Sequence, residues 1–567
     1  MEKAKQIIRK YLPAAAFAAA LLWLLYQIYP VIFATHDDMR NYTIVREGSL
    51  FQLAWEQAVC GRISQLWNTL LLGIPFLADK VWFYKAIAYA CLLFDIGSCR
   101  LLLKAHVSKP LADMSAILIV SWACLSNYHN MLVSYALCHQ LPIAFLFLSL
   151  YFFGNTLKKP SKKQAALSAL FLLLACMIYE AFLPAVFLFA GWSLLHESAK
   201  EQKCSYFAFL KKASRRILPH LSVLAGYMMI YYGWRHFYPT RYDGTSFSFQ
   251  DPFMSLLTAL FYAISFFPVT EMMNYTKRSP VPLQSILEHI SVAAWIVSAL
   301  TAAAFAILLP RMKTDKRKLF ACSLLSGVGV LIPVLVISLT PKYPDWIRRG
   351  AIGYLPSYYS FFFLVIFIAV GMVRLYTALP DKHYRTTVRV FLTAAVFFVS
   401  LTANAVTSIW RPYFDIQSLR YRNFQHAVST EPVCVLDTSW QIYAPDNPGI
   451  HLDKGLTEKF LQLYNPNQVD YLKADAPLSD AKQTLVLRMP ENYSYAVLGA
   501  ADHELCADSV TVRTLVPDAQ DIILYDTDGN AVEYDGVHDG DVLRAPDGSA
   551  FDLNVRTKLA PAGAPQS

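Results

Sequence analysis

The chain carries little charge for its length. Only 16% of its 567 residues are Asp, Glu, Lys or Arg, whereas 55% are hydrophobic. Soluble domains carry about 25% charged residues, so this composition excludes an ordinary soluble protein and indicates a polytopic membrane protein. The basic residues are dispersed among short loops, which excludes the basic stripe of a nucleic-acid-binding protein.

The ten cysteines lack the spacing of a metal site. No CxxC pair or Cys/His cluster occurs, and eight cysteines lie in or near hydrophobic segments, where they act as small apolar packers. Only Cys434 and Cys506 fall in the hydrophilic C-terminal part. An extracytoplasmic location would permit a disulfide between them, and two unlinked thiols are the alternative.

Acidic residues are scarce in the first part of the chain and abundant in the second. Residues 1–409 contain 38 basic and 18 acidic residues, whereas residues 410–567 contain 12 basic and 23 acidic residues. We therefore expect a transmembrane domain over 1–409 and a water-soluble domain over 410–557. The Ala/Pro-rich tail, 558–567, is expected to be disordered.

The hydrophobic pattern predicts about eleven membrane spans. The N-terminus lacks a small-residue cleavage site, so its first hydrophobic segment is expected to be an uncleaved anchor with a cytoplasmic N-terminus. Residues 41–80 are mixed in character and predict short surface helices. The expected spans cover about 11–35, 81–104, 110–127, 141–157, 164–196 (folding back near Glu180 and Pro184), 217–238, 290–309, 319–339, 357–376 and 390–409.

The segment 253–268 is expected to be a membrane-surface or re-entrant helix, because a crossing there would place Arg311–Lys318 outside, against the positive-inside rule.

The C-terminal part alternates strand-like runs with turns. Runs at 433–436, 484–487, 509–515 and 522–525, with four Asp-Gly pairs, predict hairpins in a small α+β or mostly β domain. Asp526–Asn530 resembles a calcium loop only superficially, because Ala531 and Val537 stand where such a loop needs Gly and Glu. A hairpin turn is the favoured interpretation there.

An acidic pair follows the first hydrophobic segment. Under the predicted topology, Asp37 and Asp38 emerge at the extracytoplasmic surface. Paired acids at that place can act as a general base on an acceptor hydroxyl, or hold a divalent cation (Mg²⁺ or Mn²⁺) against a phosphate. A solvated helix end that only fixes topology is the alternative.

Two further groups are candidates for binding substrate. Glu180 is an acid within more than thirty apolar residues, which marks either a functional site or a residue that pairs with a neighbouring helix. Arg348 and Arg349 lie on a predicted outer loop, against the charge bias of the chain. Guanidinium groups bind phosphate bidentately, so this pair is predicted to bind a lipid-linked phosphate, and ordinary lipid headgroups are the alternative.

The arrangement of His36-Asp37-Asp38 after one anchor helix, surface helices, many spans and a terminal outer domain resembles the GT-C glycosyltransferases. Among these enzymes, which transfer a sugar from a polyprenyl-phosphate donor, the chain resembles bacterial glucosyltransferases that decorate O-antigen or other surface glycans. The resemblance covers 1–409 and implies a catalytic or metal-binding role for Asp37 and Asp38. Family members often carry another acid in the second outer loop, but 127–140 contains none and offers His129, His139 and Gln140 instead.

The sequence therefore predicts a hexosyltransferase of the cytoplasmic membrane that acts on its extracytoplasmic side. The resemblance implies a polyprenyl-phosphate sugar as donor and a surface glycan or lipid-linked acceptor. We expect Asp37 or Asp38 to deprotonate the acceptor, Arg348 and Arg349 to bind the donor phosphate in the same pocket, and Glu180, His139 and His36 to contact substrate. A non-enzymatic carrier of lipid-linked saccharide and a glycan polymerase or ligase are the alternatives.

Overall fold

The computed structural model describes most of the chain and divides it into two compact units. The described residues are 2–125, 130–200, 206–240, 251–278, 287–288, 290–312, 315–348, 353, 355–430, 434–437, 469–472, 484–486, 495–499, 506–514, 519–552 and 560–561. The first unit comprises Met1–Tyr29 and Leu50–Arg411, and the second comprises Pro30–Ser49 and Pro412–Ser567. The expected domain boundary at 409/410 stays a prediction.

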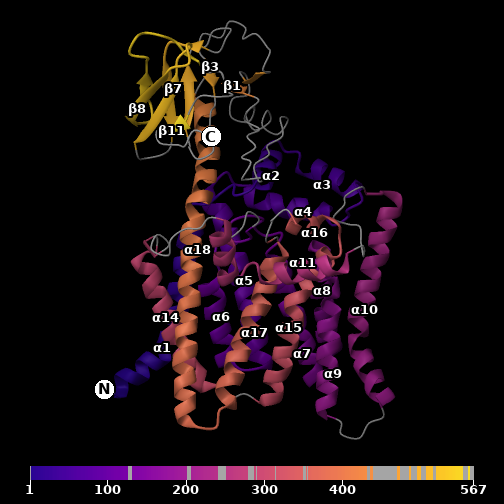
Figure 1. Ribbon diagram of the computed structural model, residues 1–567. Helices are drawn as coiled ribbons and strands as arrows, with labels where there is room; N and C mark the ends of the chain where they lie inside the picture. The colour runs from indigo at the N-terminus through magenta and orange to yellow at the C-terminus, as the bar shows by residue number, and fades with distance from the viewer. Residues whose placement is uncertain are drawn as a thin grey trace. The chain divides into compact units, whose positions relative to one another are not determined.

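Helices of 14 residues or more build most of the first unit and run side by side (Figure 1). They are α1 (Glu2–Ile28), α5 (Val81–His106), α6 (Lys109–Trp122), α7 (Leu141–Lys158), α8 (Lys162–Ile178), α9 (Val186–Lys200), α10 (Tyr206–Phe237), α14 (Val292–Leu308), α15 (Lys316–Ser338), α17 (Pro356–Ala378) and α18 (Lys382–Thr430), whose last part belongs to the second unit. Many large apolar side chains of these helices are exposed, as a bilayer requires.

Eight described helical segments are long and apolar enough to cross a membrane. The expected number, about eleven, is therefore met only approximately. The expected spans at 110–127 and 217–238 and the first half of 164–196 are not among the eight, since α6 has only 14 residues, α8 has 17, and α10 includes a basic first half. The segment predicted to lie on or re-enter the membrane is a bent pair, α11 (Pro252–Ile264) and α12 (Pro268–Arg278), with 114° between them.

Polar caps begin several of these helices. The side chains of Ser108, Ser161 and Ser291 each accept a hydrogen bond from the backbone N–H three residues later, and that of Asp315 accepts one from the N–H two residues later. A capping oxygen satisfies one of the N–H groups that a helix leaves without a partner at its start. The chain therefore places a cap directly before each of these apolar runs.

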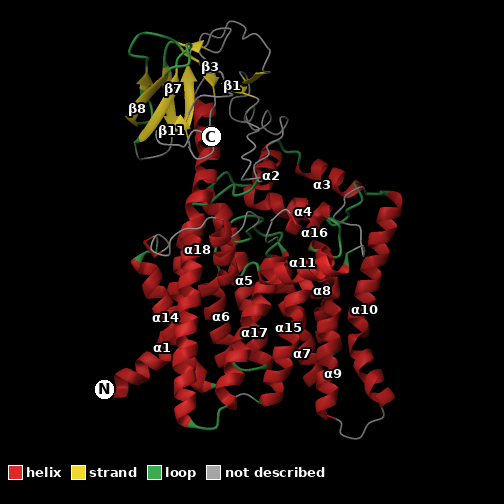
Figure 2. Ribbon diagram, viewed as in Figure 1, coloured by secondary structure: helices red, strands yellow, loops and turns green. Residues whose placement is uncertain are grey.

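Short helices gather at one end of the long ones (Figure 2). In the first unit these are α3 (Leu50–Val59), α4 (Gln65–Gly73), η1 (Ile74–Phe76), α11 and α16 (Lys342–Arg348), and a 3-10 turn, η4 (Leu309–Arg311), follows α14. The prediction of short helices over 41–80 is confirmed. A further short element, η2 (Glu180–Ala185), separates α8 from α9, so the predicted break near Glu180 and Pro184 is also confirmed.

A capped helix, α2 (His36–Arg46), lies in the N-terminal segment of the second unit. Thr35 Oγ1 accepts a hydrogen bond from the Asp38 backbone N–H at 3.3 Å, and the Asp38 carboxylate accepts from the Thr35 N–H at 3.2 Å. This reciprocal pair is a capping box. Just before it, the Ser418 hydroxyl of α18 donates to the Ile32 carbonyl oxygen at 2.6 Å and accepts from the Ile32 N–H at 2.8 Å.

The described residues in the rest of the second unit form three β-sheets. Their orders are β2-β1-β3-β4-β6-β9, β10-β5 and β11-β7-β8. The strands are β1 (Cys434–Asp437), β2 (Val469–Leu472), β3 (Thr484–Val486), β4 (Tyr495–Gly499), β5 (Cys506–Ala507), β6 (Val510–Thr514), β7 (Gln520–Tyr525), β8 (Ala531–Val537), β9 (Val542–Leu543), β10 (Phe551–Asp552) and β11 (Ala560–Pro561). The strands predicted at 433–436, 484–487, 509–515 and 522–525 are thus confirmed within a few residues.

The best-packed part of these sheets is a small apolar core. It contains Val510, Val512, Ile522, Leu524, Val537, Leu543, Ala545 and Phe551. The turn between β7 and β8 is the predicted hairpin, in which the Asp526 carboxylate accepts from the backbone N–H and side-chain amide of Asn530 at 2.7 and 2.8 Å. Gly529 has φ +87°, a conformation that favours glycine.

The capping box predicts a measurable effect of one hydroxyl on α2. Thr35→Ala removes the side-chain oxygen that caps the helix, and loss of an N-cap costs about 1 kcal/mol. We expect amide hydrogens of the first turn of α2 to exchange about fivefold faster, measured by hydrogen exchange and mass spectrometry. Thr35→Ser keeps the oxygen and should exchange as the unchanged protein does; equal exchange in all three proteins would show that the cap does not hold the helix.

Candidate functional site

The break between α8 and α9 is held by α4. The Trp67 indole N–H donates to the Met177 carbonyl oxygen at 2.5 Å, and the Asn68 amide donates to the Ile178 carbonyl oxygen at 2.8 Å. These carbonyls belong to the last turn of α8, where no helical N–H remains to bind them. α4 therefore supplies the donors that allow α8 to end inside a largely apolar body.

The same helix start positions the acid that follows the break. Ser64, directly before α4, donates from its hydroxyl to Glu180 Oε1 at 2.6 Å. Ser64 is fully buried and Glu180 is half-buried. A short hydrogen bond to a carboxylate oxygen is a strong one, so the orientation of Glu180 is fixed by α4.

Two tyrosines of α10 lie near this carboxylate. Both Tyr227 and Tyr231 interact electrostatically with Glu180. The buried Tyr227 hydroxyl does not reach hydrogen-bond geometry with any described residue, and Glu180 is the carboxylate that acts on it electrostatically. We call the group formed by Ser64, Glu180, Tyr227 and Tyr231 the helix-break site.

Two arginines flank the helix-break site. The Arg235 guanidinium lies 5.6 Å from the ring centroid of Tyr231, and Arg62 interacts with the same tyrosine. Gly61 brings the chain carrying Arg62 against the end of α10: its φ is +85°, and a Cβ there would lie 2.6 Å from Thr240 Cβ. Only glycine fits this approach, so the fold specifies where Arg62 lies.

An aromatic group adjoins the helix break. The His139 ring makes edge-on contacts with the rings of Tyr135 and Tyr179, at centroid distances of 5.5 and 5.4 Å. The Tyr359 hydroxyl donates to the His139 carbonyl oxygen at 2.6 Å. Tyr359 also packs against Tyr179 and Phe182. His139 is thus part of an aromatic cluster and contacts Tyr179, the residue before Glu180.

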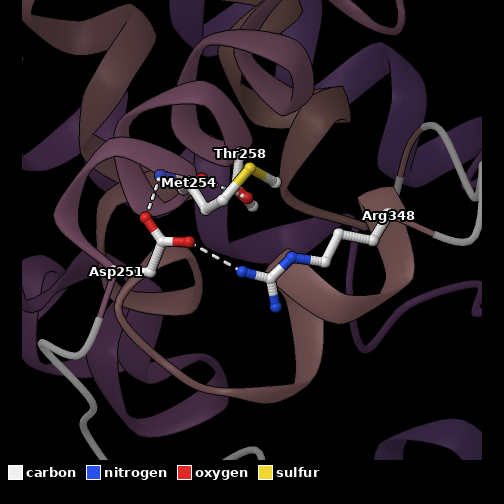
Figure 3. A network of polar contacts seen from close by, with 4 residues as sticks. All are labelled: Asp251, Met254, Thr258 and Arg348. Carbon is white, nitrogen blue, oxygen red and sulfur yellow. Dashed lines mark hydrogen bonds and ion pairs between the residues drawn. The ribbon is translucent and has the colours of Figure 1, made fainter.

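Arg348 is paired with an acid at the start of α11 (Figure 3). Its guanidinium lies 2.7 Å from Asp251 Oδ2, while Asp251 Oδ1 accepts from the Met254 N–H at 3.0 Å. Both partners are about half exposed, at 52% and 45%. An exposed ion pair is weak, so an anionic ligand can displace it. Arg349 lies outside the described residues.

The two acids that follow the first hydrophobic segment differ in their environment. Asp38 is buried and its carboxylate also accepts from the Thr35 hydroxyl, at 3.1 Å, so it belongs to the cap of α2. Asp37 is half-buried in the same first turn. The His36 side chain lies outside the described residues. Asp37 and Asp38 belong to the second unit and Arg348 to the first, so the common pocket predicted for them stays a prediction.

The described residues offer no ready-made metal cage. Nowhere in the part of the chain that the structure describes do three or more His, Cys, Asp or Glu side chains gather. The predicted cation between Asp37 and Asp38 would have to share Asp38 with the cap. The side chain of Cys434 is not among the described ones, so its predicted disulfide with Cys506 also stays a prediction.

The helix-break site and its flanking arginines together offer the groups that recognise a sugar phosphate. A fixed carboxylate and buried hydroxyls can bind sugar hydroxyls, and arginines can bind a phosphate. The sequence analysis found Glu180 but missed Ser64, Tyr227 and Tyr231, because their grouping depends on contacts more than 40 residues apart. Arg62 and Arg235 carried a usable signal, since Arg62 lies in the predicted outer surface segment and Arg235 near the outer end of the span predicted at 217–238, against the charge bias that singled out Arg348.

Part of the membrane body matches a known enzyme family. The model of the glucosyl transferase GtrII family matches residues 116–367. Two crystal structures of the Archaeoglobus fulgidus oligosaccharyltransferase are similar to this chain. The complex with Zn and sulfate has 11% sequence identity and a TM-score of 0.35, and the match covers 92% of this chain and 72% of that chain. The apo form has 10% sequence identity and a TM-score of 0.34, and the match covers 93% of this chain and 74% of that chain. No curated protein matches the chain. The family match confirms the class predicted from the sequence, and the chain is a membrane glycosyltransferase.

Proposed function

We propose that this protein is a GT-C-type hexosyltransferase that uses a polyprenyl-phosphate sugar. It transfers the sugar to a surface glycan or lipid-linked acceptor on the extracytoplasmic side of the cytoplasmic membrane. The observation that carries the proposal is that the segment matching the glucosyl transferase family, 116–367, contains Glu180, Tyr227 and Tyr231 of the helix-break site.

The orientation follows from charge. The Arg311 guanidinium donates to the Arg9 carbonyl oxygen at 2.8 Å, and Lys158 Nζ donates to the Ala105 carbonyl oxygen at 2.6 Å, so basic residues gather where these helices meet. The positive-inside rule assigns this basic end to the cytoplasm. α8 has 17 residues and is therefore about 25 Å long. It starts at the basic end, so Glu180, which follows its last residue, is proposed to lie at the opposite face.

The helix-break site is proposed to bind the transferred sugar. The carboxylate of Glu180 is held by Ser64 at 2.6 Å and can accept hydrogen bonds from two sugar hydroxyls. Tyr227 and Tyr231 offer further hydroxyls, and His139 lies in the aromatic cluster beside it. A sugar needs both kinds of surface, because its ring has polar edges and apolar faces.

The donor phosphate is proposed to bind Arg348 and Arg349. α15 begins with basic residues, contacts both η2 and α16, and ends before Arg348, which supports placing this arginine on the same face as Glu180. A guanidinium group stabilises the phosphate that leaves when the sugar is transferred. Arg62 and Arg235 are a second pair of cationic residues that would also bind the donor phosphate.

Asp37 is proposed as the general base, with His36 beside it in the sequence as a substrate contact. The acceptor O–H would lose its proton to the Asp37 carboxylate as its oxygen bonds to the anomeric carbon. The bond between that carbon and the phosphate oxygen breaks, and polyprenyl phosphate leaves with the electron pair. Because the described residues do not fit a metal cage, no step is routed through Mg²⁺ or Mn²⁺.

The two aspartates are expected to differ when each is replaced by Asn. Asp37→Asn removes the base and should lower sugar transfer by about 100-fold or more. Asp38→Asn keeps an oxygen that can accept the Thr35 N–H, so transfer should fall by less than about tenfold. The measurement is transfer of labelled sugar by purified protein; full activity in both variants would remove these acids from the mechanism.

Arg348 is expected to contribute to donor binding rather than to stability alone. Arg348→Gln should raise the KM for the donor about tenfold, because a charge-assisted contact with phosphate is lost. Asp251→Asn is the matched control: it breaks the same ion pair but keeps a side chain that caps α11. If both variants change KM equally, the arginine acts only through Asp251, and the phosphate role is wrong.

A further inference from the structure

A cavity of about 120 Å³ lies between five helices, close to the basic end of the first unit. α5, α7, α9, α15 and α17 contribute its lining, and several of these helices pack directly on one another. The walls are almost entirely apolar, with residues such as Leu103, Phe147, Leu188 and Phe363. Apolar cavities of about 150 Å³ stay dry and bind hydrocarbon, so this one suits part of a hydrocarbon chain.

One wall of the cavity is fixed by a glycine. A Cβ on Gly154 would lie 2.5 Å from His106 Cε1 and 2.5 Å from Trp192 Cη2, so both rings lie directly against the α7 backbone. His106 is also held at 3.0 Å from the Tyr151 carbonyl oxygen. The cavity is therefore formed by rings that have little room to move.

The cavity is not sealed. Trp192, Ala321 and Leu325 all line it, yet each is only half-buried. Lys318, which also lines it, is exposed. A chain from outside can therefore reach the apolar interior past a cationic group.

Positive charge is concentrated at this place. Lys318 lines the cavity together with His106, and Lys158 Nζ donates to the carbonyl oxygen of Ala105, the residue before His106, at 2.6 Å. In the described part of the chain, neither lysine has a salt bridge to a carboxylate. Two neighbouring ammonium groups without an acid between them favour an anion.

We propose that this cavity binds one acyl chain of an anionic phospholipid, whose phosphate contacts Lys158 and Lys318. Two features select this ligand: the positive charge at the exposed rim matches an anionic headgroup, and the apolar interior matches a hydrocarbon chain. The charged rim of this lipid site lies at the basic ends of α7 and α15, whereas Glu180 of the helix-break site follows the far end of α8, so the headgroup position is distinct from the proposed donor site. It does not depend on the sugar-transfer mechanism.

The test is a lipid titration of the full purified chain, followed by native mass spectrometry. Phosphatidylglycerol should bind with higher affinity than phosphatidylcholine with the same acyl chains. Lys158→Gln and Lys318→Gln should each weaken phosphatidylglycerol binding about fivefold, because each removes one charge near the headgroup. Lys316→Gln, a change of an exposed lysine outside the cavity, is the matched control and should leave the affinity unchanged.

A cavity-filling variant tests the acyl chain separately. Ala321→Phe should lower phosphatidylglycerol affinity by at least about tenfold without changing the melting temperature or elution volume. Leu325→Phe serves the same purpose if Ala321→Phe does not fold. Equal affinity for both lipids, equal weakening by Lys316→Gln, or unchanged affinity in a folded filled variant would overturn the proposal. Preferential occupation by polyprenyl phosphate over phosphatidylglycerol would overturn it too.

Discussion

The first unit depends on a helix that ends within an apolar body. α8 stops at Ile178, and its last carbonyl groups would have no partner if α4 did not bind them through Trp67 and Asn68. In a bilayer an unsatisfied backbone group costs several kcal/mol, so this docking is a condition for the break to exist. Because Ser64 comes from the same helix start, the contact that permits the break also orients Glu180.

Function follows from what such a break allows. A continuous apolar helix presents an apolar surface along its whole length. A capped break in it allows a polar residue to lie at the edge of the apolar segment. Glu180 is that residue here, with tyrosines of α10 and flanking arginines close by. The enzyme proposed here needs a polar site for a sugar next to an apolar path for its lipid, and a broken helix would supply both.

Much of this architecture could be predicted from the sequence, because hydrophobic length and loop charge are local signals. The break near Glu180 and Pro184 is visible since an acid and a proline interrupt more than thirty apolar residues. The span count was harder: α6 is short, and α10 joins a basic stretch to an apolar one without interruption. The role of Asp38 was also hidden, because the pair Asp37-Asp38 looks alike in sequence, and only the hydrogen bonds to Thr35 distinguish its members. Likewise, nothing local in Ser64 or Tyr227 reveals that each lies beside an acid more than 40 residues away.

The most direct measurement is an experimental structure of the full protein with a non-transferable polyprenyl-phosphate hexose. The account predicts that the hexose lies within hydrogen-bond distance of the Glu180 carboxylate, with the Ser64–Glu180 contact kept. A hexose bound at the basic end of the helices, or on the same face but out of reach of Glu180, would contradict it.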